Sequence, residues 1–158
     1  MRIPYRHLLP IAVLALSATF SQAAELSSDG KAAIPRDVQQ LIVVDYRAMQ
    51  NSTAAMDLKE RVLPPELKRL ETALKNAKLN VDKDADVLAF ASFRDSGAQG
   101  TKIVCIAQGQ FQTQAILAGF AKSKTKPVVV RNNNIYPMGS AGMSVAFLNQ
   151  TTMVFGDR

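Results

Sequence analysis

Residues 87–108 read VLAFASFRDSGAQGTKIVCIAQ, and this stretch decides the fold. Two apolar segments, 87–94 and 101–108, flank a polar turn at 95–100, which predicts a β-hairpin. Along both segments the odd and the even positions are apolar, so each strand presents apolar side chains on both of its faces. Strands of this kind lie in the middle of a sheet that is covered on both sides.

The first 23 residues predict a secretory signal peptide. Arg2 and Arg6 precede an apolar run over 8–20, and small residues follow it, so we expect cleavage between Ala23 and Ala24. The run is about 13 residues, short of the roughly 20 that a spanning helix needs, so we expect no stable membrane span after cleavage. An uncleaved anchor is the alternative.

Cleavage changes the length, the histidine content and the net charge of the chain. Removing 23 of the 158 residues leaves 135, one domain's worth, and removes His7, the only histidine. The formal net charge falls from +6 (19 minus 13) to +4 (17 minus 13), because Arg2 and Arg6 are lost. A charge of this size without a clustered arginine and aromatic face predicts no nucleic-acid binding.

The single cysteine, Cys105, lies inside the second strand of the hairpin. No intramolecular disulfide can form, which favours a bacterial periplasm over animal secretion, where small domains carry several disulfides. A catalytic thiolate needs a nearby base and access to solvent, and the mature chain has no histidine. We therefore expect a buried structural cysteine.

Carboxylate chemistry is the enzyme hypothesis that the sequence leaves open. Asp45 and Asp157 both follow predicted strands, and two carboxyl groups that face one cleft could perform acid–base work. The alternative is that each caps a turn or pairs with an arginine such as Arg94. Asp45, Arg94 and Asp157 are thus the candidate polar residues, and we expect the domain to be non-catalytic.

No cofactor or metal site is predicted. The spacing of Asp82, Asp84 and Asp86 is similar to that of a calcium loop, but Val87 and Phe93 replace its glycine and its closing glutamate. We interpret these residues as solvated turn carboxylates. Three lysines at 122, 124 and 126 follow a predicted helix and complement its dipole, with a phosphate site as the alternative.

The remaining segments predict one α+β domain over 37–158, after a flexible lead-in at 24–36. An apolar run at 41–44 predicts a buried strand, and a stripe of Ala55, Leu58 and Val62 predicts a short helix to residue 63. Further helices are expected at 65–78 and 112–123, and further strands at 127–131, 135–138, 143–148 and 151–155.

This order of elements indicates a mainly antiparallel sheet with a split βαβ (ferredoxin-like) core followed by a β-meander. That arrangement would pack the helices on one face. The strands offer apolar side chains to both faces, so we expect the second face to be uncovered and to associate with something else.

Several short segments resemble a family of uncharacterised exported bacterial proteins with no assigned activity. They are Ile34-Pro35-Arg36-Asp37, Val44-Asp45, Leu63-Pro64-Pro65-Glu66, Asp84-Ala85-Asp86, Ala107-Gln108-Gly109-Gln110-Phe111 and Val154-Phe155-Gly156-Asp157. The resemblance implies an exported bacterial α+β domain. It also implies that further chain follows Gly156 in such proteins, so that residue 158 ends a truncated domain.

Two classes of function follow. The first is an exported, non-catalytic interaction or binding domain of the bacterial envelope. Its partner would be another protein, the remainder of a longer parent chain, or a second copy that meets an apolar sheet face. The alternative is a small-ligand-binding domain or a carboxylate-dependent hydrolase.

Overall fold

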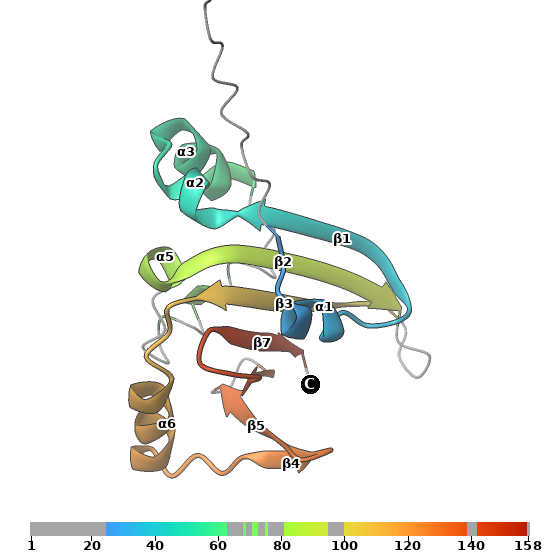
Figure 1. The fold of residues 1–158 in the computed structure, drawn as a ribbon, viewed down its shortest axis with the longest axis vertical. Coiled ribbons are helices and arrows are strands. Elements are labelled where there is room, and N and C mark those ends of the chain that lie inside the picture. The colour runs from blue at the N-terminus through green and yellow to red at the C-terminus, as the bar shows by residue number, and fades with distance from the viewer. Residues whose placement is uncertain are drawn as a thin grey trace, which may run out of the picture.

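The computed structural model describes residues 25–62, 68, 71–72, 75, 81–94, 100–138 and 142–157. A single sheet runs through the molecule, with helices at its ends and on its faces (Figure 1). The helices are α1 (Ser28–Ala32), α2 (Tyr46–Gln50), α3 (Thr53–Val62), α5 (Val81–Asp84) and α6 (Thr113–Lys122). The strands are β1 (Val38–Asp45), β2 (Ala85–Arg94), β3 (Thr101–Gly109), β4 (Val128–Val130), β5 (Asn133–Met138), β6 (Met143–Phe147) and β7 (Thr152–Asp157).

The seven strands lie in the order β1-β2-β3-β7-β6-β5-β4, and each neighbouring pair is antiparallel. Two meanders, β1 to β3 and β4 to β7, therefore share one sheet through the pairing of β3 with β7. The turn between β4 and β5 consists of Arg131 and Asn132, both with positive φ (47° and 67°). Two such residues in a two-residue hairpin loop match the right-handed twist of the strands.

One face of the sheet packs against α2 and α6. Leu88, Cys105 and Phe155 from three adjacent strands lie in one cluster with Ile116 and Phe120 of α6. Their burial removes the apolar surface of the central strands from water on this side.

The opposite face packs against the chain that leads into β1. Ala89 of β2 and Ile106 of β3 are paired and fully buried, and Leu26 packs against them together with Ala33 and Ile34. The short helix α1 lies against β3 on this side (Figure 1). Both faces of the hairpin are thus covered, as its apolar pattern predicts, whereas the expectation of an uncovered second face is wrong for these strands.

The α+β class, the antiparallel sheet and the terminal meander are confirmed, but the strand order differs from a split βαβ core. That core would make the first two strands parallel and insert a third between them. Instead β2 pairs directly with β1, and Asp45 at the end of β1 lies opposite Val87 near the start of β2. The helical connection returns the chain to the end of the sheet that it left, so the two strands are antiparallel neighbours.

Two related expectations are also corrected. The helices do not share one face, because α1 and α6 lie on opposite faces. Residues 24–36 are not a flexible lead-in over their described part. Leu26 is buried, and the Ser27 hydroxyl accepts a hydrogen bond from the Gly30 amide and so caps α1. The Ser27 amide donates to Oε1 of Gln108 at 3.0 Å, which fixes α1 to β3.

The helix expected at 65–78 lies largely outside the described residues. The described positions within it, Lys68, Glu71, Thr72 and Lys75, are helical. The α3 and α6 helices and the strands β2 to β7 lie close to their predicted ranges.

Candidate functional site

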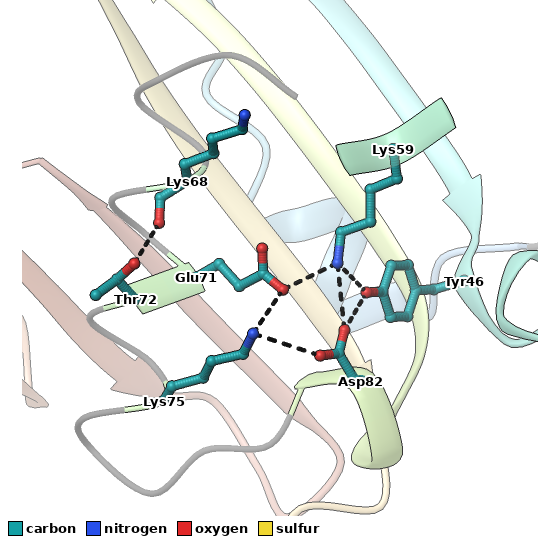
Figure 2. Close-up of polar contacts among 7 residues, drawn as sticks. All are labelled: Tyr46, Lys59, Lys68, Glu71, Thr72, Lys75 and Asp82. Carbon is teal, nitrogen blue, oxygen red and sulfur yellow. Dashed lines mark hydrogen bonds and ion pairs between the residues drawn. The ribbon is translucent and has the colours of Figure 1, made fainter. Parts of the chain in front are cut away.

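A cluster of charged and phenolic side chains links α2, α3 and α5 at one end of the sheet (Figure 2). At its centre is Nζ of Lys59, which donates to the Tyr46 hydroxyl at 2.7 Å and to Oε1 of Glu71 at 2.9 Å. The same ammonium lies 3.3 Å from Oδ1 of Asp82, and the Tyr46 hydroxyl donates to that oxygen at 2.5 Å. Lys75 completes the cluster, 3.3 Å from Glu71 and 3.8 Å from Asp82.

Local sequence signals place the members of this Lys59 cluster. Asp45 ends β1 and caps α2, because its carboxylate accepts a hydrogen bond from the Ala48 amide at 2.8 Å. Tyr46 is therefore the first residue of α2 and is turned into the interior. Ser52 accepts from the Ala55 amide at the start of α3, which carries Lys59.

The face that α3 buries differs from the predicted one. Leu58 was expected on the apolar stripe, but it is 58% exposed. Its neighbour Lys59, one turn after Ala55, has a side chain only 9% exposed. The position i+4 from Ala55 also faces inward in a helix. A lysine fits this position because two carboxylates and a phenol surround its ammonium group.

The electrostatics of Tyr46 argue against a catalytic base. Burial raises the pKa of Tyr46 to about 12, the Asp82 carboxylate that accepts its hydrogen bond adds to the rise, and Lys59 opposes it. A tyrosine that acts as a general base needs a lowered pKa. The Tyr46 hydroxyl therefore stays protonated at neutral pH and serves as a hydrogen-bond donor.

The ions of the Lys59 cluster compensate one another. Burial alone would lower the pKa of Lys59, but hydrogen bonds to Tyr46 and Glu71 and the Asp82 charge outweigh it, so the pKa is raised. Burial would raise the pKa of Asp82, but the bond from Tyr46 and the Lys59 charge outweigh it, so the pKa is lowered. Lys59 and Asp82 thus stay charged, and with Lys75 and Glu71 the cluster combines two lysines with two carboxylates, which suits a structural tie between segments.

The three polar residues predicted as candidates do not come together. Asp45 lies in one row with Val87, Gln108 and Thr152 across the sheet. Asp157 lies five residues beyond Thr152 along β7, which is about 17 Å at 3.4 Å per residue. Its strand is also three strands away from β1. Its side chain is not among those described. The two carboxylates that the hydrolase hypothesis requires thus start from opposite ends of the sheet.

Arg94 is the last residue of β2 and is exposed, opposite Thr101 and away from Asp45. The arginine nearest to the Asp45 end, Arg47, pairs instead with Asp86. Ala23 and Ala24, the predicted cleavage site, lie outside the described residues. Within the described part of the chain, no group of three His, Cys, Asp or Glu side chains is placed to hold a metal ion.

Cys105 is buried, as predicted, at 1% exposure. Burial raises the pKa of the Cys105 thiol well above its usual value, so the thiolate needed for nucleophilic chemistry is disfavoured.

A second candidate site is apolar and lies on the outer strands. On β1, Leu41, Ile42 and Val43 are 43%, 48% and 40% exposed. The same holds for β4 at the other edge, where residues 128–130 are each at least 45% exposed. The surplus apolar surface thus gathers on the two edge strands and not over one whole face, because both faces of the central strands are covered.

No protein-family model, curated protein or solved structure matches this chain. In the described part of the molecule, no helix combines the length and the apolar character that crossing a membrane requires.

Proposed function

We propose that this protein is an exported, non-catalytic interaction domain of the bacterial envelope, which binds a protein partner through the β1 edge. The observation that carries the proposal is the exposed run Leu41, Ile42 and Val43 on a strand that pairs, among the described strands, with β2 alone. An edge strand presents unpaired amide and carbonyl groups, and these can add a strand from another chain.

The chemistry of the other candidates supports the same assignment. The Lys59 cluster is compensated internally, with Tyr46 protonated, and Cys105 is buried as a thiol. Neither supplies an activated nucleophile or a base poised near neutral pH. The apolar β1 edge, in contrast, exposes Leu41, Ile42 and Val43 to water, and a protein partner would cover them.

Site-specific photo-crosslinking in the native cell tests the interaction. A photoreactive amino acid at Ile42 is expected to give a protein adduct, whereas the same residue at Leu58, which is equally apolar and more exposed, gives none. Adducts at both positions, or at neither, would contradict a partner at the β1 edge.

Export has its own test. Periplasmic material is expected to begin at Ala24, which N-terminal sequencing reads directly. Intact chain that begins at Met1 and stays in the membrane fraction would overturn export as a cleaved protein.

A further inference from the structure

The two edge strands differ in how far they are protected from pairing with another chain. β4 has only three residues, and Lys124, Lys126 and Arg131 flank it. A short strand flanked by positive charges is a common means of blocking edge-to-edge association. β1 has eight residues, and its segment from Val38 to Val44 contains no charged residue and no proline.

This difference selects the occupant of the β1 edge. A copy of β4 brought to β4 would place lysines and arginines of equal sign side by side, which is unfavourable. A copy of β1 brought to β1 meets no such charge between Val38 and Val44, although Asp37 and Asp45 at its two ends restrict the register. Pairing of β1 with β4 of another copy would be head-to-tail and would leave an open edge at each end of the assembly.

We infer that the protein forms a two-fold symmetric dimer in which the β1 strands of two copies pair antiparallel and join their sheets. This pairing rests on the proposed function and names its partner, a second copy of the chain. The dimer sets Ile42 opposite Ile42 of the second copy.

The register follows from the geometry of β1. Only every second residue of an edge strand points its N–H and C=O groups outward. In a two-fold antiparallel pair these residues must face one another, so the axis passes through a residue and not between two residues. The regular part of β1 begins at Gln40, since the register against β2 shifts between Val38 and Gln40. It ends at Asp45, whose side chain caps α2.

A centre at Ile42 places Leu41 opposite Val43 and Gln40 opposite Val44, so the exposed apolar run covers itself. A centre at Leu41 would bring the shifted segment into the pair and set Asp37 opposite Asp45, two like charges. A centre at Val43 would set the Asp45 carboxylate opposite Leu41. The Ile42 register is therefore the self-complementary one.

The dimer also uses both faces of the edge. Leu41 and Val43 lie in register with Ala91 and Ala89, on the face that carries α1. Ile42 lies in register with Phe90, on the face that carries α6. A second β1 strand would shield all three at once, whereas a partner that covers a single face would leave one side of β1 in water.

Charge substitution at Ile42 tests the pairing. Sedimentation of the mature chain at micromolar concentration is expected to show a dimer. Ile42→Lys and Ile42→Glu should each raise the dissociation constant at least about tenfold, since each places like charges opposite one another on the two-fold axis. Mixing the two variants should restore a dimer that contains one copy of each. Leu58→Lys on α3 is the matched control and should leave the dimer intact.

A cysteine scan tests the register without relying on charge. Ile42→Cys should give more disulfide-linked dimer on mild oxidation than Leu41→Cys or Val43→Cys, whose partners are offset along the strand. A maximum at residue 41 or 43, or a mixture of Lys and Glu variants that stays monomeric, would overturn the Ile42 register. Circular dichroism of each variant confirms that it is folded.

The outcomes separate this dimer from the broader proposal. An adduct of the Ile42 photo-probe with the mass of two chains supports the dimer. An adduct with a different protein, together with a monomer in sedimentation, overturns the dimer and leaves the proposed interaction function standing. A folded monomer that gives no adduct at all overturns both.

Discussion

Nζ of Lys59 lies 2.7 Å from the Tyr46 hydroxyl oxygen, across 13 residues of sequence. The contact joins the first residue of α2 to the buried side of α3, and Asp82 brings α5 to the same point. The Lys59 cluster thereby ties the helical connection to the end of the sheet where β1 stops and β2 starts.

Lys59→Met should destabilise the protein by about 2–3 kcal/mol. The change leaves Glu71 and Asp82 near each other without their central cation, and removing one partner of a buried ion pair costs about 3–5 kcal/mol. We expect less than that range because the Asp82 side chain is 34% exposed. Urea unfolding followed by circular dichroism measures the change.

Lys75→Met is the matched control, since Lys75 contacts the same two carboxylates but is 58% exposed. An exposed pair contributes roughly 0–1 kcal/mol, so this variant should stay close to the parent. Equal losses for the two variants would mean that Lys59 is no more important than a surface charge.

Stability should fall at alkaline pH through the Lys59 cluster. The pKa of Tyr46 is about 12 in the folded protein and 10.0 ordinarily, and that of Lys59 is also raised. Both groups hold their protons more tightly when folded, so their contribution is complete below pH 10 and is lost as pH rises towards 12. Asp82, with a lowered pKa, acts in the opposite sense and contributes above its ordinary value of 3.8.

The cluster should therefore contribute evenly from about pH 5 to 9 and weaken outside that window. Urea unfolding at a series of pH values measures this dependence, and tyrosinate absorbance should show the late titration of Tyr46. Tyr46→Phe should remove that late phase. A parent protein whose stability is unchanged between pH 9 and 11.5 would contradict the assignment.

Local sequence patterns predict the individual helices and strands, but they do not predict the order of the strands in the sheet. The hairpin at 87–108 could be placed because its apolar pattern is continuous on both faces. The run at 41–44 has the same composition, yet β1 is an edge strand whose residues are exposed. Composition reports that a side chain is apolar, and only the tertiary arrangement decides which strand receives a neighbour.

The sequence does not predict the Lys59 cluster, because only the tertiary arrangement brings its members together. Tyr46, Lys59, Asp82 and the pair of Glu71 and Lys75 lie on separate segments, and no short motif relates them. One signal is present in the sequence: Lys59 falls one turn after Ala55, a residue of the predicted inward stripe, so the two side chains share one side of α3. A lysine at such a position predicts a buried partner of opposite charge.

Gly109→Ala should be strongly destabilising, by roughly 3 kcal/mol. A Cβ atom at Gly109 would lie 1.8 Å from the Asp84 carbonyl oxygen and 2.8 Å from Cα of Ala85, both of which are backbone atoms that cannot rotate away. The strand would have to move and would weaken the bond of 2.8 Å from the Gln110 amide to the Asp84 carbonyl. Thermal or urea unfolding measures the loss.

Gly119→Ala supplies the opposite case. Gly119 lies inside α6, and a Cβ atom there meets nothing within 4 Å. Alanine should stabilise the helix by about 0.5–1 kcal/mol through its better helix propensity. A Gly109→Ala protein as stable as the parent would show that β3 does not approach Asp84 this closely.

Cys105 should behave as a packing residue and not as a reactive one. Its side chain is 1% exposed and belongs to the same hydrophobic cluster as Phe155, its register partner on β7. A bulky maleimide can therefore reach the thiol only when the sheet opens. We expect labelling of the native protein to be slow and to accelerate in urea, whereas Leu58→Cys in a Cys105→Ala background should label at once. Cys105→Ala itself should cost about 1 kcal/mol, the price of a small cavity. Rapid labelling of native Cys105, measured by mass spectrometry, would place the thiol at the surface and would contradict the arrangement of β3 in the centre of the sheet.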